Sequence, residues 1–164
     1  MGSAHLATYL NDHLAGAVGA IELMAHVEHA YDGHPAAAAL GPLRRDIEAD
    51  RDALRAIIER LDVHEKALRK AAGWLGERLL RLKLRVDDPA GGALRLFESL
   101  ETIALGLEGK RTLWHALAAV APSVPALQGV DYDRLIARAQ AQRGMVEPLR
   151  LDAAREAFTA AARR

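Results

Sequence analysis

Three ionisable side chains, Glu101, Glu108 and His115, recur every seven residues along a strongly helical segment, on a line beside its apolar arc. Carboxylates and imidazoles are common ligands of iron, manganese and zinc in proteins. Without a metal or a cationic partner, an ionised carboxylate is costly to bury. The spacing therefore predicts either metal ligands or ion pairs at this edge of a core.

Polar side chains also interrupt the apolar stripes of two other segments. Asp50 and Arg51 fall at the margins of one stripe, with Glu48 on its flank, and Gln142 falls within another, with Arg143 beside it. We expect Arg51 and Arg143 to bond the carboxylates in a buried ion-pair network, because an ionised group in a core is costly unless it is paired. The alternative is that these side chains face water and the helices are rotated by one position. The polar core candidates are Glu48, Asp50, Arg51, Glu101, Glu108, Gln142 and Arg143.

A second group of possible ligands lies near the end of the first helical segment. Glu22, His26 and His29 share one helix face, and imidazole and carboxylate together suit zinc or nickel. No fixed catalytic zinc spacing accompanies them, so we favour a solvated polar face. His26 and His29 remain the alternative surface metal site.

Turn residues and apolar periodicity predict the elements that position these side chains. Leucine-rich stripes with a helical period fill five segments, and strand-like alternation is nearly absent. Pro42 is expected as a first helical residue, Asp131 as an N-cap, and Pro148 as a kink or break. The expected segments are about 4–30, 42–61, 62–86, 93–121 and 132 to near the C-terminus, and an alternative start of the second includes the alanine run 36–39.

This pattern predicts an all-α protein with a single domain over residues 1–164. Four of the five segments are long enough to cross a small bundle. The expected architecture is a four-helix bundle of two helical hairpins, joined by a helical crossover over the third segment, which gives five helices in all.

This layout, with carboxylates in the middle of the helices, resembles the ferritin-like superfamily, in particular small uncharacterised bacterial ferritin-like domains. The metal-binding members carry a Glu on the first and third bundle helices and Glu-x-x-His on the second and fourth. Here Arg51 follows Glu48 where the motif has His, and the fifth segment has no Glu-x-x-His. The carboxylate ligands that the resemblance implies are Glu22 (or Glu28), Glu48, Glu101 and Glu108, with His115 as the only nitrogen ligand.

Composition excludes several other classes of protein. The chain has no Cys, which excludes disulfides and thiolate metal sites, and its 22 Lys+Arg balance its 22 Asp+Glu, so no global charge indicates nucleic acid. No apolar run reaches about 18 residues, so no transmembrane segment is expected. The N-terminus has no signal-peptide pattern, and we expect a cytoplasmic protein.

Three functions stay open. The leading hypothesis is a non-enzymatic ferritin-like bundle with no cofactor and no working di-metal centre, acting through interactions or in a stress response. The second is a ferritin-like protein that binds di-iron or manganese through its carboxylates. The third is an adaptor that contacts a membrane or a partner through the basic third segment. A homodimer or an unknown protein partner is plausible for each.

Overall fold

The computed structural model describes residues 2–61 and 92–159, and this part of the chain is helical without strands. It contains four α-helices, α1 (Gly2–Ala30), α2 (Pro35–Arg60), α4 (Gly92–Val120) and α5 (Tyr132–Thr159). Two short 3-10 helices, η1 (Ala121–Ser123) and η2 (Pro125–Leu127), join α4 to α5. The all-α prediction is confirmed. The expected third helix, with its basic side chains, lies outside the described residues.

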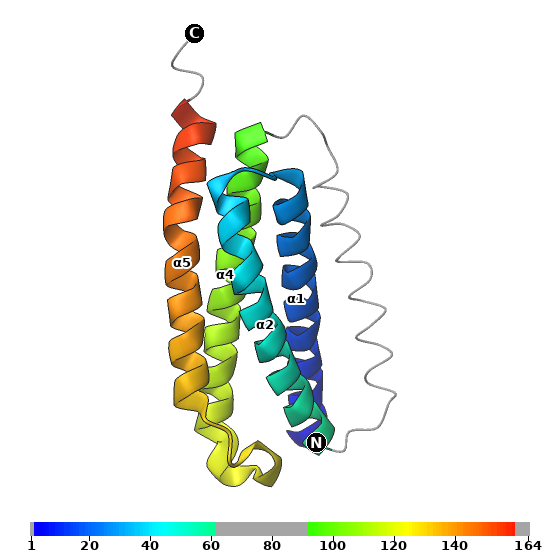
Figure 1. The fold of residues 1–164 in the computed structure, drawn as a ribbon. Helices are drawn as coiled ribbons and strands as arrows, with labels where there is room; N and C mark the ends of the chain where they lie inside the picture. The colour runs from blue at the N-terminus through cyan, green and yellow to red at the C-terminus, as the bar shows by residue number, and fades with distance from the viewer. Residues whose placement is uncertain (1, 62–91, 160–164) are drawn as a thin grey trace.

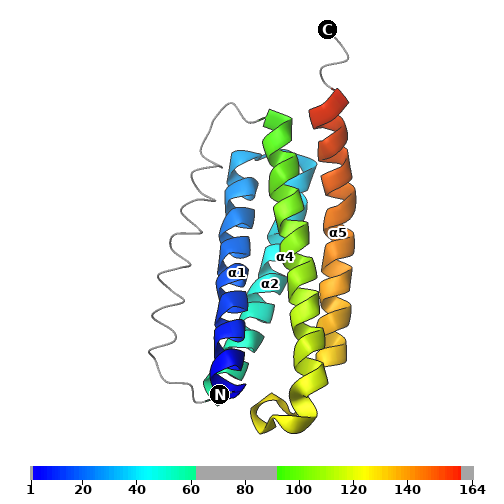
Figure 2. The same cartoon turned by 180° about the vertical axis from the view of Figure 1, so that it is seen from behind.

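The helices form two antiparallel hairpins, α1 with α2 and α4 with α5, and α1 packs against α4 (Figure 1). Viewed from either side, α2 and α4 run in the same direction, so α2 ends at the opposite end of the bundle from the start of α4 (Figure 2). Contacts at both ends join the hairpins. The Tyr31 hydroxyl donates to the carbonyl of Gly92 at 3.0 Å, and Arg60 donates to the carbonyl of Gln128 at 3.2 Å.

Helix α2 begins at Pro35, seven residues before the expected start at Pro42. The physical reason is a better N-terminus upstream: Pro35 is the first helical residue, and the His34 ring nitrogen Nδ1 accepts the backbone N–H of Ala36 at 3.1 Å. Ala36 and Ala37 of the first turn are buried, Ala36 in the core cluster that contains Met24 and Val27 of α1, and the exposed Pro42 lies inside the helix. The expected start at Pro42 is therefore wrong, and the alternative that residues 36–39 extend this helix backwards is confirmed.

Helix α5 has the expected start but lacks the expected break. The Asp131 carboxylate accepts the backbone N–H of Arg134 at 3.0 Å, which confirms Asp131 as the cap. Pro148 lies inside α5, which continues to Thr159 without a break. The Pro148 ring is exposed, and buried Val146 and Ala153 on either side hold the helix in the bundle. Packing here outweighs the local preference of proline.

The core of the described residues divides into two apolar clusters along the bundle axis. One contains Met24 and Ile47, and the other contains Leu54 and Trp114. Asp50 lies on α2 between the stripe positions Ile47 and Leu54, so a polar layer separates the two clusters. None of the described helices combines the length and apolar character needed to cross a membrane.

Candidate functional site

The polar layer is built around the carboxylate of Asp50, which is only 2% exposed. Lys110 of α4 donates to its Oδ2 at 2.5 Å, and Arg138 of α5 donates to its Oδ1. The side-chain amide of Gln142 on α5 also donates to Oδ2, at 3.2 Å. We call these four residues the Asp50 network. It joins α2 of the first hairpin to both helices of the second.

Lys110 is the central donor of the Asp50 network, and its side chain is 12% exposed. It donates a second hydrogen bond to the amide oxygen of Gln142. Burial lowers the pKa of Lys110 below its ordinary value, and the Asp50 carboxylate opposes that effect. The lysine therefore depends on Asp50 for compensation, just as the carboxylate depends on the two cations.

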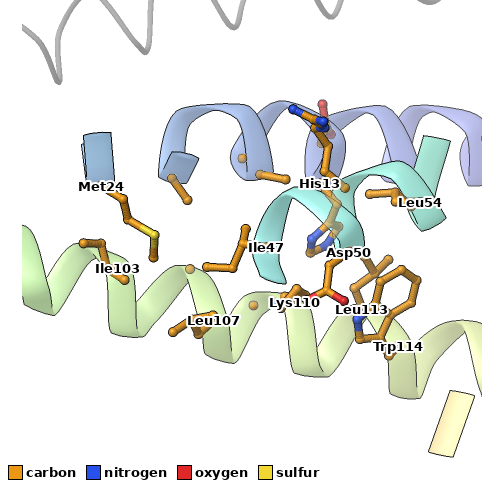
Figure 3. Close-up of a pocket in the computed structure, with 17 residues that line it drawn as sticks. His13, Met24, Ile47, Asp50, Leu54, Ile103, Leu107, Lys110, Leu113 and Trp114 are labelled. Carbon is orange, nitrogen blue, oxygen red and sulfur yellow. Dashed lines mark hydrogen bonds and ion pairs between the residues drawn. The ribbon is translucent and has the colours of Figure 1, made fainter. Parts of the chain in front are cut away.

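A pocket opens beside the Asp50 network, between α1, α2 and α4, with a cavity volume of about 180 Å³. Figure 3 shows Asp50, Lys110 and Trp114 at one end of this pocket and Met24 and Ile103 at the other. Most of the other lining side chains are aliphatic or are glycines and alanines. The pocket is thus apolar along its length and polar at one end.

His13 and Trp114 complete the polar end of the pocket. The half-buried His13 ring extends from α1 toward Asp50 (Figure 3), and burial lowers its pKa, with the Asp12 carboxylate opposing the shift. Trp114 is almost fully buried, and its indole Nε1 has no hydrogen-bond partner in the described part of the chain. A buried donor without an acceptor is uncommon and costs stability.

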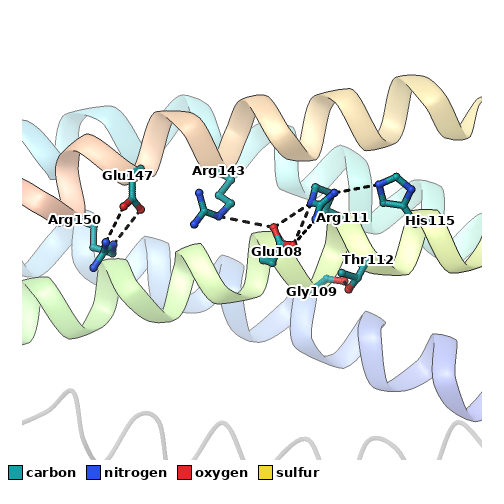
Figure 4. Close-up of polar contacts among 8 residues, drawn as sticks. All are labelled: Glu108, Gly109, Arg111, Thr112, His115, Arg143, Glu147 and Arg150. Atoms are coloured by element: carbon teal, nitrogen blue, oxygen red, sulfur yellow. Dashed lines mark hydrogen bonds and ion pairs between the residues drawn. The ribbon is translucent and has the colours of Figure 1, made fainter.

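A second carboxylate with two cations lies at the surface between α4 and α5. Arg111 donates to Glu108 at 2.6 Å, and Arg143 of α5 approaches it to 3.8 Å (Figure 4). His115 contacts Arg111 at 3.2 Å. Glu108, Arg111, His115 and Arg143 form what we call the Glu108 ladder. The hydrogen bond from Arg111 lowers the pKa of Glu108, whose side chain is 38% exposed.

Arginines also engage most of the other predicted carboxylates. Glu101 lies 3.5 Å from Arg150, which also bonds Glu147 at 2.7 Å. Glu48 bonds Arg44 at 2.8 Å, and the same arginine bonds the α1 residue Glu28, also at 2.8 Å. These pairs are half-buried at the margins of the bundle. They do not enter the polar layer.

The predicted polar core divides into two sets in the structure. Asp50 and Gln142 are buried and bonded to each other, whereas Glu48, Glu101, Glu108 and Arg143 lie at the margins. Arg51 lines the pocket, but it pairs with its neighbour Asp52 at 2.8 Å and not with Glu48, Glu101 or Glu108. The two predicted arginines are thus not the ones that enter the polar layer.

The implied metal ligands do not come together. Across residues 2–61 and 92–159, no three His, Asp or Glu side chains are grouped closely enough to hold a metal ion. Glu22 and His29 are exposed and His26 is half-buried near the end of α1, so that face of the helix remains a polar surface. The set Glu22, Glu48, Glu101, Glu108 and His115 therefore forms no single site. A di-metal centre does not fit the residues at the middle of the bundle, where one carboxylate already holds two cations.

The interruptions of the apolar stripes did not identify Lys110 and Arg138 as partners of Asp50, although their spacing from core residues places both near the core. Arg138 precedes Gln142 by four residues, so the two side chains share a helix face. Lys110 follows the core residue Leu107 by three residues, and its long aliphatic chain carries the ammonium group to Asp50.

Comparison of the chain with models of protein families, with curated proteins and with solved structures found no match.

Proposed function

We propose that this chain is a ferritin-like helical bundle without a working di-metal centre, and that it acts by binding and not by catalysis. The observation that carries the proposal is the Asp50 network. A carboxylate that projects inward from the middle of a helix is neutralised by Lys110 and Arg138, where a metal-binding bundle would use cations of iron or manganese.

The direction of the helices supports the ferritin-like part of the proposal. In α1 to α5 the two hairpins are arranged so that α2 and α4 are parallel (Figure 1), which requires the long connection found in ferritin-like bundles. The arginine pairs of Glu48, Glu101 and Glu108 support the absence of a metal centre. A guanidinium group stays protonated and cannot ligate iron.

The test is the metal content of the untagged full chain after expression with iron, manganese and zinc supplied. We expect less than stoichiometric metal by mass spectrometry, and a melting temperature that a chelator leaves unchanged. About two metals per chain, lost in Glu101→Ala, would contradict the proposal and favour the di-metal alternative. Glu98→Ala, a neighbouring exposed carboxylate of α4, is the matched control.

A further inference from the structure

The walls of the pocket between α1, α2 and α4 set the size and character of what it can hold (Figure 3). The cavity of about 180 Å³ has an apolar lining that includes Met24, Ile47, Leu54, Ile103 and Leu107. An apolar cavity of about 150 Å³ holds a benzene molecule. Side chains that face such a space lack packing contacts, which a molecule that fills it supplies. The pocket therefore has room for a six-membered ring with a short substituent.

Small residues form the mouth of the pocket. Gly16 of α1 and Gly106 of α4 line the pocket and are exposed, so the pocket opens to solvent between these two helices. A Cβ atom placed on either glycine would meet no atom within 4 Å. Ala20, also on the α1 wall, is half-buried. Larger side chains at Ala20 or Gly106 would therefore take up space that a ligand needs.

At the polar end the buried groups bond one another and leave a ligand little to bond. Both oxygens of Asp50 accept hydrogen bonds within the Asp50 network. Lys110, whose side chain is 12% exposed, donates two of its three N–H groups to Asp50 and Gln142. The indole Nε1 of Trp114 has no partner among the described residues, but its accessible surface is below 1 Å², so a molecule in the pocket cannot contact it. This end therefore closes the pocket and does not recognise a polar group.

The charged side chains around the pocket favour neither an anion nor a cation. Asp50 is bonded by Lys110 and Arg138, Arg51 is bonded to the next residue along the chain, and burial lowers the pKa of His13, which favours its neutral form. Among the described residues, the acidic groups in or beside the pocket are Asp12, Asp46, Asp50 and Asp52, and the basic groups are Arg51, Lys110 and Arg138. No excess of positive charge is left for an anion. The surplus acidic charge lies on exposed side chains, where water screens it from a cation inside the pocket.

We propose that the pocket binds a small, uncharged, apolar molecule of about the size of an alkylbenzene. Burial of the ligand surface against the aliphatic walls supplies the affinity, and no hydrogen bond to the protein is needed. The inference rests on the proposed binding function and names the class of ligand. It follows from a cavity that is large enough for a ring, open at one side and closed at its polar end by groups that already bond one another.

Four probes of similar size share a benzene ring and differ in one short substituent: ethylbenzene, benzyl alcohol, benzoate and benzylamine. Calorimetric titration of the full chain should show saturable binding of ethylbenzene. Benzyl alcohol should bind about tenfold more weakly, because its hydroxyl group loses hydration without gaining a partner, and the two ionic probes should not bind. No binding of ethylbenzene would overturn the proposal. So would benzyl alcohol or benzoate that binds as tightly as ethylbenzene, since Lys110 would then offer its third N–H to the ligand.

Methyl resonances of methionine in carbon-13 NMR spectra report where the ring lies. The chain has three methionines, Met1, Met24 and Met145. Met24 lines the apolar part of the pocket, whereas Met145 is 50% exposed on α5 and does not line it. Ethylbenzene should shift the Met24 methyl resonance, which a Met24→Leu variant assigns, and should leave that of Met145 in place. Saturable binding that leaves the Met24 resonance unshifted would contradict the assigned location.

Two pairs of variants test the location from opposite walls. Ala20→Leu fills the pocket from α1 and should abolish binding of ethylbenzene, whereas Ala116→Leu, at an exposed position of α4 outside the pocket, should leave it unchanged. Gly106→Leu should weaken binding from the α4 side. Its matched control is Gly144→Leu on α5, where a Cβ atom would also meet no atom within 4 Å but which does not line the pocket. Unchanged binding in both Ala20→Leu and Gly106→Leu would overturn the assigned location.

Metal content and ethylbenzene binding are measured on the same preparation, so that the two proposals can fail separately. A metal-free chain that binds no probe refutes only this inference. A chain that binds ethylbenzene and also carries two metals refutes only the proposed absence of a metal centre.

Discussion

The Asp50 network and the Glu108 ladder use the same charges in two different environments. Each has one carboxylate held by a cation from α4 and a cation from α5: Lys110 and Arg138 for Asp50, Arg111 and Arg143 for Glu108. Asp50 is 2% exposed, whereas the Glu108 side chain is 38% exposed. Water and salt screen the ladder, while the network must compensate its charges from within. Burial therefore decides which of two similar ion clusters the fold depends on.

The largest expected effect is the loss of the Asp50 carboxylate. Asp50→Ala leaves Lys110 and Arg138 without their anion and should lower the free energy of unfolding by about 3–5 kcal/mol, measured by urea denaturation. Glu108→Ala removes the matching carboxylate of the ladder and should change the unfolding midpoint little. A similar loss in both variants would show that burial does not separate the two clusters.

An intermediate effect is expected from Lys110→Met, which keeps much of the aliphatic length. Asp50 retains its bonds from Arg138 and Gln142, so the loss at neutral pH should be about 1–3 kcal/mol. The difference from the unmodified chain should also depend on pH. Burial holds the pKa of Lys110 below its ordinary 10.5, with Asp50 and Asp46 opposing the shift and Arg138 adding to it.

The direction in which the free energy of unfolding changes with pH follows from the number of protons that Lys110 binds in the folded and unfolded chains. Between the lowered pKa and 10.5 the unfolded chain binds more protons at Lys110 than the folded chain, so stability rises with pH in that window. The advantage of the unmodified chain over Lys110→Met should therefore grow as pH approaches 10.5. Tyr9 and Tyr132, whose pKa values burial raises, are present in both proteins and cancel in the difference. Urea denaturation of both proteins at several pH values measures it, and an advantage that shrinks over this window would contradict the direction of the shift.

A smaller effect than that of Asp50→Ala is expected when the whole layer is replaced by apolar residues. A variant with Asp50→Leu, Lys110→Met and Gln142→Leu buries no charge from these three positions, and Arg138, whose side chain is 30% exposed, can turn to water. Its unfolding free energy should lie closer to that of the unmodified chain than that of Asp50→Ala does. Thermal melts of the three proteins side by side provide the comparison. A triple variant less stable than Asp50→Ala would mean that the network itself is strongly stabilising.

The helices could be predicted from the sequence because apolar residues must repeat with the helical period wherever one face is buried. Helix α4 illustrates this: its predicted span of about 93–121 is within one residue of Gly92–Val120 at each end. The start of α2 could be placed only approximately, because Pro35 and Pro42 both follow turn-like residues. The cap that begins the helix at Pro35 is a histidine, His34, which is not among the residues that usually mark an N-cap.

The candidate site was predicted only in part, for a geometric reason. Asp50 and Gln142 interrupt apolar stripes and are buried, so the pattern identified them. Arg143 follows Gln142 directly and Arg138 precedes it by four residues, so both lie near the same part of α5, yet Arg138 bonds Asp50 and Arg143 approaches Glu108. Which of the two faces inward depends on how α5 is rotated against the neighbouring helices, and that rotation is set by packing.

The polar layer between the two apolar clusters has a consequence for how the hairpins align along the bundle axis. Aliphatic side chains recur at every turn, so two apolar faces can slide past each other by one turn, about 5.4 Å, and still pack. Asp50 has its three partners at only one height, and a slip of one turn would leave it unpaired in the apolar cluster of Ile47 or of Leu54. The layer thus selects a single axial alignment of the two hairpins, as one buried polar residue does in a coiled coil.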